Sequence, residues 1–408
     1  MNALSRQSPE VRQYLLVTGN YWAFTLTDGA LRMLVVLHFH ALGYAPLQIA
    51  ALFLFYEIFG VITNLVGGYL GARLGLNRTM NIGLGLQVGA LLMLAVPAVL
   101  LTIPWVMAAQ ALSGIGKDLN KMSAKSSIRL LVPDAQQGTL YKWVAILTGS
   151  KNALKGVGFF LGGALLAWLG FAGAVMVMAG VLAMIWLASL ALLKKDMGKA
   201  TAKPKFRDLL SKSRAINILS AARFFLFGAR DVWFVVALPV YLSTVFGWDF
   251  WQVGGFLALW VIGYGAVQSV APAITGKRTG HVPDGRAALV WALLLAGIPA
   301  AIAVGMQVMP QVPMILVGGL LVFGVLFAVN SSLHSYLIVS YAREDGVSLD
   351  VGFYYMSNAL GRLIGTLLSG WVFQVQGLAA CLWVSSGFVL LAAIISHGLP
   401  RHHALTRG

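Results

Sequence analysis

The feature that most constrains the fold is a succession of apolar runs, each about as long as a lipid bilayer is thick. A helix needs about 20 mainly apolar residues to cross a hydrocarbon core of about 30 Å. The runs predict an all-α membrane protein with twelve transmembrane helices. They lie at 14–39, 47–71, 79–101, 104–126, 140–168, 172–193, 216–245, 252–274, 286–306, 313–339, 352–374 and 378–398.

Composition and charge support this interpretation and exclude several others. Of the 408 residues, 59% are hydrophobic and 10% are charged, whereas about 25% are charged in soluble domains. The formal net charge is +16, but the basic residues are scattered through the connections between apolar runs. This distribution excludes a compact nucleic-acid-binding module. The single cysteine, Cys381, excludes an intramolecular disulfide.

The basic residues lie on one side of the predicted membrane. By the positive-inside rule this side, which holds Arg12, Arg73 and Arg78, is cytoplasmic. We therefore expect a multi-pass protein of the cytoplasmic membrane with both termini inside, and no removable signal peptide. No Lys or Arg occurs in the connections near 40–46, 102–103, 169–171, 246–251, 307–312 and 375–377.

The two halves of the sequence resemble each other. Residues 150–170 align with 357–377, and this alignment superposes Lys155 on Arg362. Internal duplication is typical of transporters whose binding site lies between the repeats near the bilayer midplane. We expect two pseudo-symmetric six-helix bundles at 1–193 and 216–408, joined by a basic cytoplasmic linker at 194–215.

Lysines occur inside two predicted helices of the first half. Lys117 and Lys121 are four residues apart on one helix, and Lys151 and Lys155 are four apart on the next, so each pair shares a helix face. Ionisable groups at membrane depth are costly and face an aqueous cavity or a charged partner. Asp118 can pair with Lys121 but cannot neutralise all four lysines. We therefore expect these lysines to bind an anion.

Arginines supply further cations. Arg32, Arg230 and Arg362 lie in the predicted helices 14–39, 216–245 and 352–374. We expect them to bind the substrate as well, because a planar guanidinium binds a phosphate or arsenate bidentately.

Two further basic residues, Lys125 and Arg223, lie closer to the predicted cytoplasmic ends of their helices. Long basic side chains in such positions can extend to water while their stems cover apolar surface. Each therefore has two open interpretations, as a group that reaches the aqueous phase or as a further cation of the anion site, and Arg230 is a stronger candidate than Arg223.

The carboxylates in the predicted helices have two open interpretations. Asp28, Asp118 and Asp231 either pair with nearby cations, as Asp28 can with Arg32 four residues later, or couple transport to protons. Glu57 is expected to serve packing or an interhelix hydrogen bond. The remaining polar groups, expected in the wall of a cavity, are Tyr21, Asn330 and His334.

The sequence contains no pattern typical of an enzyme. It has no Gly-rich phosphate loop, no nucleophile elbow and no metal-ligand spacing. A membrane receptor would be expected to carry a sizeable soluble sensing region, which is also missing. We therefore expect a transporter that has no cofactor or metal, rather than an enzyme or a receptor.

One loop resembles the signature loop of the major facilitator superfamily. It reads GGYLGARLGLNRTM over residues 67–80, with Gly68, Arg73, Gly75 and Arg78 at the positions of that motif. Ala72 stands where the family usually has Asp. The resemblance implies the all-α fold of that superfamily and a gating role for the loop. We expect hydrogen bonds and packing, rather than a charge relay, to hold it.

A closer resemblance covers nearly the whole chain. The stretches 20–44, 64–84 and 117–133 are similar to organoarsenical efflux permeases of bacterial arsenic-resistance operons. The resemblance implies a bacterial inner-membrane exporter of 1-arseno-3-phosphoglycerate. It also implies that a partner glyceraldehyde-3-phosphate dehydrogenase makes this compound and that its export confers arsenate resistance. The residues alone indicate only a carrier for a small anion, so uptake or exchange of an ordinary phosphorylated metabolite is the alternative. We expect a monomer.

Overall fold

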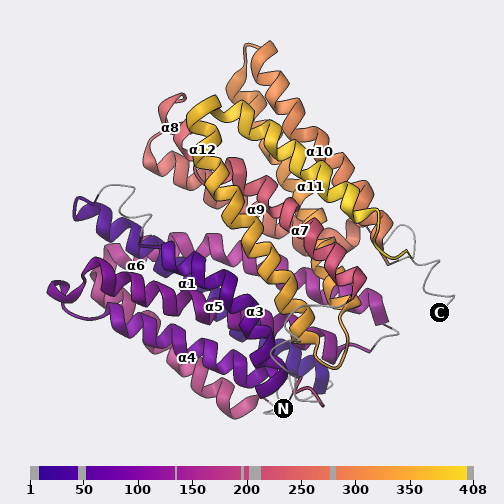
Figure 1. Ribbon diagram of the computed structural model, residues 1–408. Helices are drawn as coiled ribbons and strands as arrows, with labels where there is room; N and C mark the ends of the chain where they lie inside the picture. The colour runs from indigo at the N-terminus through magenta and orange to yellow at the C-terminus, as the bar shows by residue number, and fades with distance from the viewer. Residues whose placement is uncertain are drawn as a thin grey trace. The chain divides into compact units, whose positions relative to one another are not determined.

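The computed structural model describes residues 9–44, 52–133, 136–193, 197–201, 213–275 and 282–401. Helices dominate these ranges (Figure 1). They are α1 (Pro9–Ala41), α3 (Leu54–Leu74), α4 (Leu76–Leu94), the short 3₁₀ helix η2 (Ala98–Leu100), α5 (Ile103–Leu131), α6 (Gln137–Leu192), α7 (Arg214–Phe234), α8 (Ala237–Thr244), α9 (Phe250–Thr275), α10 (Gly285–Val308), α11 (Val312–Tyr341) and α12 (Val347–Ser396).

The two longest helices each contain a break at a glycine. Gly170 in α6 has φ 68° and Gly377 in α12 has φ 78°. A glycine adopts this conformation without the steric penalty that a Cβ atom brings. Both breaks fall in the short connections predicted at 169–171 and 375–377, so each long element consists of two successive helices. The predicted total of twelve transmembrane helices stays a prediction.

Prolines account for two differences from the predicted helix ends. The run predicted at 79–101 stops being α-helical after Leu94, shortly before Pro97, because the residue before a proline disfavours helical geometry. The run predicted at 216–245 is interrupted between α7 and α8. Pro239 has no N–H to continue the hydrogen-bond ladder, and the hydroxyl of Ser369 accepts instead from the N–H groups of Val236 and Ala237.

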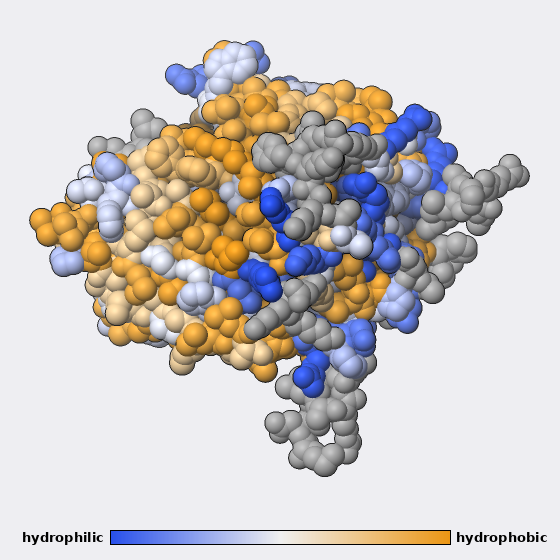
Figure 2. All heavy atoms as spheres, turned by 60° about the horizontal axis from the view of Figure 1, so that its bottom comes forward, coloured by the Kyte–Doolittle hydropathy of each residue, from blue (hydrophilic) through white to orange (hydrophobic). Residues whose placement is uncertain are grey.

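The described helices have the composition and surface of a membrane protein. Seven described helical spans, one of which joins α7 and α8, are long and apolar enough to cross a bilayer. Figure 2 shows one face of the protein, on which apolar residues form broad orange areas. Large apolar side chains such as Trp168, Leu187, Met314 and Leu367 are mostly exposed. In a bilayer such side chains contact lipid chains rather than water, so this surface carries no desolvation penalty.

The chain forms two compact units. Each unit consists mainly of one half of the sequence and takes in one helical segment from the other half. The first unit comprises Met1–Leu140, Ser150–Leu210 and Ala342–Met356, and the second comprises Tyr141–Gly149, Ser211–Tyr341 and Ser357–Gly408. Most of the predicted linker, 194–215, lies outside the described residues.

In the first unit, α5 packs against α1, α3 and α4. Small residues allow these close approaches. A Cβ atom placed on Gly116 of α5 would lie 2.7 Å from the carbonyl oxygen of Gly83 in α4, and one on Gly114 would lie 2.8 Å from that of Tyr56 in α3. Backbones this close leave the polar side chains of α1, α3 and α5 within reach of one another.

The core of the second unit is aromatic. Trp233 of α7 packs edge-to-face against Trp260 of α9 and Phe323 of α11. The indole N–H of Trp260 donates to the carbonyl of Leu320 at 2.9 Å, so this buried polar group is satisfied. These contacts join α7, α9 and α11 in a rigid support for the charged side chains of α7.

Each unit contains a helix crossing lined by glycines. In the first unit, Cβ atoms on Gly158 and Gly162 of α6 would lie 2.8 Å and 2.3 Å from backbone oxygens of α1. In the second unit, Cβ atoms on Gly361 and Gly365 of α12 would lie 2.2 Å and 2.6 Å from backbone oxygens of α7. The two crossings carry the two aligned cations, Lys155 and Arg362, and the alignment also superposes Gly158 on Gly365. The pseudo-symmetry of two six-helix bundles stays a prediction.

Candidate functional site

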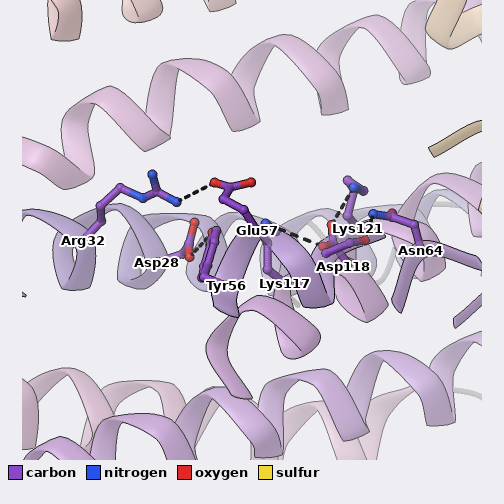
Figure 3. Close-up of polar contacts among 9 residues, drawn as sticks. Asp28, Arg32, Tyr56, Glu57, Asn64, Lys117, Asp118 and Lys121 are labelled. Carbon is purple, nitrogen blue, oxygen red and sulfur yellow. Dashed lines mark hydrogen bonds and ion pairs between the residues drawn. The ribbon is translucent and has the colours of Figure 1, made fainter. Parts of the chain in front are cut away.

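Charged side chains from α1, α3 and α5 gather in the first unit (Figure 3). On α1, Arg32 lies beside Glu57 of α3, and its Nη2 donates to Oε1 of Glu57 at 3.2 Å. Asp28 instead accepts from the hydroxyl of Tyr56 at 2.7 Å. Glu57 therefore makes the interhelix hydrogen bond expected of it, and Asp28 and Arg32 each have a bonded partner on α3.

Asp118 on α5 lies between two lysines. Its carboxylate is 2.6 Å from Nζ of Lys121 and 3.6 Å from Nζ of Lys117. The pairing with Lys121 at three-residue spacing was predicted, and the structure confirms it. A Cβ atom on Gly60 of α3 would lie 3.0 Å from Oδ2 of Asp118, so this glycine leaves room for the carboxylate.

Aromatic rings cover the cations of this cluster. Nζ of Lys117 lies 3.8 Å from the centre of the Tyr56 ring, and the guanidinium of Arg32 lies 4.7 Å from the same centre. Lys121 and Lys125 lie over Tyr355 at 4.7 Å and 5.2 Å. The negative face of an aromatic ring stabilises a cation that has lost part of its water.

Lys125 does not extend to water as the sequence suggested. Its side chain is 3% exposed because α5 continues to Leu131 and Tyr355 of α12 covers it. Of the two interpretations of Lys125, the one in which it reaches the aqueous phase is therefore wrong, and its role as a further cation of the anion site stays a prediction.

The remaining cations of this unit are on α6. Lys151 donates to the side-chain oxygen of its neighbour Asn152 at 3.3 Å. Lys155 lies where α6 crosses α1, because its backbone carbonyl oxygen would be 2.7 Å from a Cβ atom placed on Gly29 of α1. The described spans of α1, α3, α5 and α6 contain ten Lys and Arg residues and four carboxylates, of which Glu10 lies in the first turn of α1. Six of the cations are candidates for the site, and the other three carboxylates lie on the same helices. The candidate cations are Arg32, Lys117, Lys121, Lys125, Lys151 and Lys155, and the carboxylates are Asp28, Glu57 and Asp118.

Tyr21 on α1 is a further polar group in the first unit. Its side chain is almost completely buried, and its hydroxyl makes no hydrogen bond within the described part of the chain. A buried hydroxyl without a partner is costly, so Tyr21 retains a donor that a ligand or water can use.

In the second unit, one carboxylate joins two arginines. Oδ1 of Asp231 accepts from Nε of Arg230 at 2.6 Å, and Oδ2 accepts from Nε of Arg362 at 2.9 Å. Asp231 is fully buried, whereas the side chains of Arg230 and Arg362 are 15% and 33% exposed. The pair of arginines is therefore held from the buried side and accessible from the other.

A third arginine, Arg223, lies two helical turns away on α7. Its side chain is 3% exposed, so the interpretation that it extends to water was wrong. Nε donates to Oδ1 of Asn358 at 2.9 Å and Nη1 donates to Ser331 at 3.3 Å. The sequence did not reveal its contacts with Asn358 or with Phe227, whose ring centre lies 3.8 Å from the Arg223 guanidinium.

The two polar groups of α11 are in different environments. Asn330 donates to the carbonyls of Trp291 and Leu326 at 2.8 Å and 3.0 Å, so its amide binds α10 and its own helix. His334 is completely buried, and neither ring nitrogen has a hydrogen-bond partner in the described ranges. Within those ranges no group of three or more His, Cys, Asp or Glu side chains could hold a metal ion.

The predicted gating loop joins α3 to α4 at Gly75, whose φ of 97° favours glycine. The carbonyl of Gly68 accepts from the hydroxyl of Ser348 at 2.7 Å, and the carbonyl of Ala72 accepts from the N–H of Ala200 at 2.8 Å. Hydrogen bonds thus surround the position where an Asp was expected. In the same loop, Arg73 donates to the hydroxyl of Tyr69 and Arg78 is exposed.

Comparison with known families fits this helical architecture. A sequence model described as Major Facilitator Superfamily matches residues 15–308, which is more than half of the chain. The chain belongs to this superfamily. It is therefore a multi-pass membrane carrier for secondary transport of small solutes, and it is not an enzyme. No curated protein sequence matches it significantly.

Solved structures share the fold of this carrier at low sequence identity. The human organic anion transporter MFSD10 (TETRAN) is 19% identical, with a TM-score of 0.75 over 96% of this chain and 100% of that one. A variant of the E. coli fucose:proton symporter FucP is 13% identical, with a TM-score of 0.74 over 96% and 99%. A bacterial homologue of the iron transporter ferroportin is 15% identical, with a TM-score of 0.69 over 93% and 98%.

Proposed function

We propose that this carrier exports 1-arseno-3-phosphoglycerate from the bacterial cytoplasm by alternating access and thereby confers arsenate resistance. The observation that carries the proposal is the excess of buried or half-buried cations over carboxylates. In the first unit Arg32, Lys117, Lys121, Lys125, Lys151 and Lys155 accompany Asp28, Glu57 and Asp118. In the second unit Asp231 binds Arg230 and Arg362, and Arg223 is bonded to Asn358. The resemblance of residues 20–44, 64–84 and 117–133 to organoarsenical permeases supports this particular substrate.

The cation excess calls for an anion because a net charge is costly in the interior of a membrane protein. Ionisable groups at membrane depth are retained where they face water, a partner or a transported ion. The proposed substrate has a phosphate at one end and an arsenate at the other, so it suits a carrier in which both units have surplus cations. Lysines act as point charges, and arginines can bind the tetrahedral ends bidentately.

The membrane potential is sufficient to drive this export. Moving one charge through 100 mV is worth about 2.3 kcal/mol, whereas a tenfold concentration ratio costs about 1.4 kcal/mol. A multiply charged anion is therefore driven out of a cell whose interior is negative. Coupling to protons through Asp28, Asp118 or Asp231 would require these carboxylates to leave the partners they have here.

The proposed setting follows from the same substrate. The carrier lies in the bacterial inner membrane as a monomer with both termini in the cytoplasm. A cytoplasmic glyceraldehyde-3-phosphate dehydrogenase supplies the arsenylated compound, and hydrolysis outside the cell releases arsenate. This arrangement needs no contact between the carrier and the dehydrogenase.

The second candidate function is uptake or exchange of an ordinary phosphorylated metabolite. The same cations would bind it, and one structure with the same fold is described as an organic anion transporter. A direct competition between 3-phosphoglycerate and its arsenylated derivative distinguishes the two candidates. The proposed exporter should prefer the arsenylated compound.

Inverted membrane vesicles test the proposal directly. With an interior-positive potential and no pH gradient, vesicles containing the carrier should accumulate 1-arseno-3-phosphoglycerate, and vesicles without it should not. Potential-driven accumulation supports uniport. Accumulation only when a pH gradient is imposed would replace uniport by proton coupling, and no accumulation under either gradient would refute the proposed substrate.

A further inference from the structure

We infer that α7 and α12 of the second unit form a subsite for tetrahedral oxyanions, one that binds inorganic phosphate or arsenate by itself. The inference deepens the proposed function and rests on it, because it assigns the phosphate-type end of the substrate to particular residues. We call these residues the arginine ladder. They are Arg223, Phe227, Arg230, Asp231 and Arg362.

The ladder begins on one face of α7. Residues three and four apart are neighbours on a helix surface, so Phe227 lies between Arg223 and Arg230. The Arg223 guanidinium is 3.8 Å from the centre of the Phe227 ring, and that of Arg230 is 5.0 Å from it. One aromatic ring thus stabilises two guanidinium groups by cation–π interactions.

The ladder continues onto α12 because two glycines bring that helix against α7. Cβ atoms on Gly361 and Gly365 would lie 2.2 Å and 2.6 Å from the carbonyl oxygens of Phe224 and Gly228. This close approach places Nε of Arg362 2.9 Å from Asp231, and it places Oδ1 of Asn358 2.9 Å from Nε of Arg223. Arg223 therefore has a bonded neighbour on α12, and Arg230 shares the carboxylate of Asp231 with Arg362 of α12.

The charges of the ladder do not balance. Between residues 223 and 231 of α7 and between 358 and 362 of α12, the ionisable side chains are three arginines and one aspartate. One arginine would be enough to balance the negative charge of Asp231 if the group served only as a structural ion pair. The local charge of +2 matches a dianion such as hydrogen phosphate or hydrogen arsenate.

Asp231 acts as a positioning residue. It is completely buried and uses one oxygen for each of Arg230 and Arg362. Asp231 holds Arg230 through Nε and Nη2 and holds Arg362 through Nε, which fixes the direction of each planar guanidinium. Planar forks held in this way recognise tetrahedral oxyanions by paired hydrogen bonds, which lysine cannot do.

The test is thermal stabilisation of the full-length protein in detergent by inorganic phosphate, with ionic strength kept constant by chloride. Phosphate should raise the melting temperature of the wild type with a saturable dependence, because a ligand of the folded state stabilises it. Arg362→Lys and Arg230→Lys keep the charge but lose the fork. They should need about tenfold more phosphate for the same rise. The exposed Arg286→Lys is the matched control and should behave as the wild type.

Asp231→Asn separates positioning from simple charge. The variant adds one net positive charge, so a carboxylate that merely competes with phosphate predicts tighter binding. A positioning carboxylate predicts binding several-fold weaker than in the wild type. Having two arginine variants keeps the test decisive if one of them fails to fold.

Three results would overturn the subsite. They are no phosphate-dependent rise in the wild type, an equal phosphate requirement in the wild type and both lysine variants, and tighter binding in Asp231→Asn. Failure of the proposed function is a different observation. If phosphate stabilises the carrier but the carrier moves no 1-arseno-3-phosphoglycerate, the subsite is supported and the proposed substrate is refuted. If the carrier moves this compound but phosphate does not stabilise it, only the subsite is refuted.

Discussion

At the scale of single residues, the balance between cations and carboxylates decides what the carrier can bind. Asp118 is within ion-pair distance of both Lys117 and Lys121. Asp231 is likewise within ion-pair distance of both Arg230 and Arg362. A carboxylate shared by two cations lowers the cost of burying them but leaves the group with a net positive charge. An arriving anion can balance that charge without displacing the carboxylate.

Removing the aligned cations tests this idea. Lys155→Ala and Arg362→Ala should each reduce arsenate resistance to the level of cells without the carrier, because each removes a cation at a helix crossing. Growth of arsenate-sensitive cells in arsenate measures the effect, and immunodetection in membranes confirms insertion. Lys142→Ala on the exposed side of α6 is the control and should retain resistance. Full resistance in both test variants would remove Lys155 and Arg362 from the site.

At the scale of helices, glycines set where the charged side chains meet. The crossing of α12 with α7 depends on Gly361 and Gly365, and the crossing of α6 with α1 depends on Gly158 and Gly162. Small residues at interfaces are typical of membrane helices, which associate through close packing rather than through the hydrophobic effect. The G-x-x-x-G pattern of α6, weak as a motif, is here a packing device that positions Lys155.

Adding a methyl group at one crossing should therefore affect function and stability together. Gly361→Ala would put a Cβ atom 2.2 Å from the carbonyl oxygen of Phe224, which forces α12 away from α7 and separates Arg362 from Asp231. Overpacking of this kind costs about 1–3 kcal/mol. We expect a lower melting temperature in detergent and loss of arsenate resistance.

The control for this change is Gly297→Ala on α10. Nothing lies within 4 Å of a Cβ atom at that position, and alanine is favoured over glycine in a helix by about 1 kcal/mol. The control should keep or raise the melting temperature. Equal melting temperatures for Gly361→Ala and the wild type would contradict the close crossing.

At the scale of the whole molecule, each compact unit contains a segment from the other half of the sequence. In the first unit this segment is Ala342–Met356. Ser348 donates to the carbonyl of Gly68, and a Cβ atom on Gly68 would lie 2.4 Å from the carbonyl oxygen of Ser348. We propose that such contacts form and break during the alternating access proposed above, so that they shift its conformational equilibrium.

A cysteine at position 348 reports on this packing. In a background with Cys381→Ala, Ser348→Cys should react slowly with a water-soluble maleimide, because position 348 is completely buried. Adding Gly68→Val should expel the segment and raise the labelling rate about tenfold or more, since valine cannot fit against the Ser348 backbone. Unchanged labelling after this substitution would show that Gly68 does not hold the segment.

The sequence by itself determined the helical architecture, because the length and hydropathy of a membrane-spanning run are local properties. The runs predicted at 252–274 and 286–306 correspond to α9 at Phe250–Thr275 and α10 at Gly285–Val308. The i,i+3 pairing of Lys121 with Asp118 also followed from helical spacing alone. The all-α class and the presence of lysines and arginines within apolar runs needed no further information.

Only the tertiary structure decided which charges meet. Spacing suggested that Arg32 pairs with Asp28, yet its bonded partner is Glu57 on another helix. The position of Arg223 near a predicted helix end left open that it reaches water, yet it is buried against Phe227 and Asn358. The physical reason is that ion pairing between helices depends on their rotation and on the distance at which they cross. Glycine contacts far apart in the sequence set both, and no local pattern of residues records them.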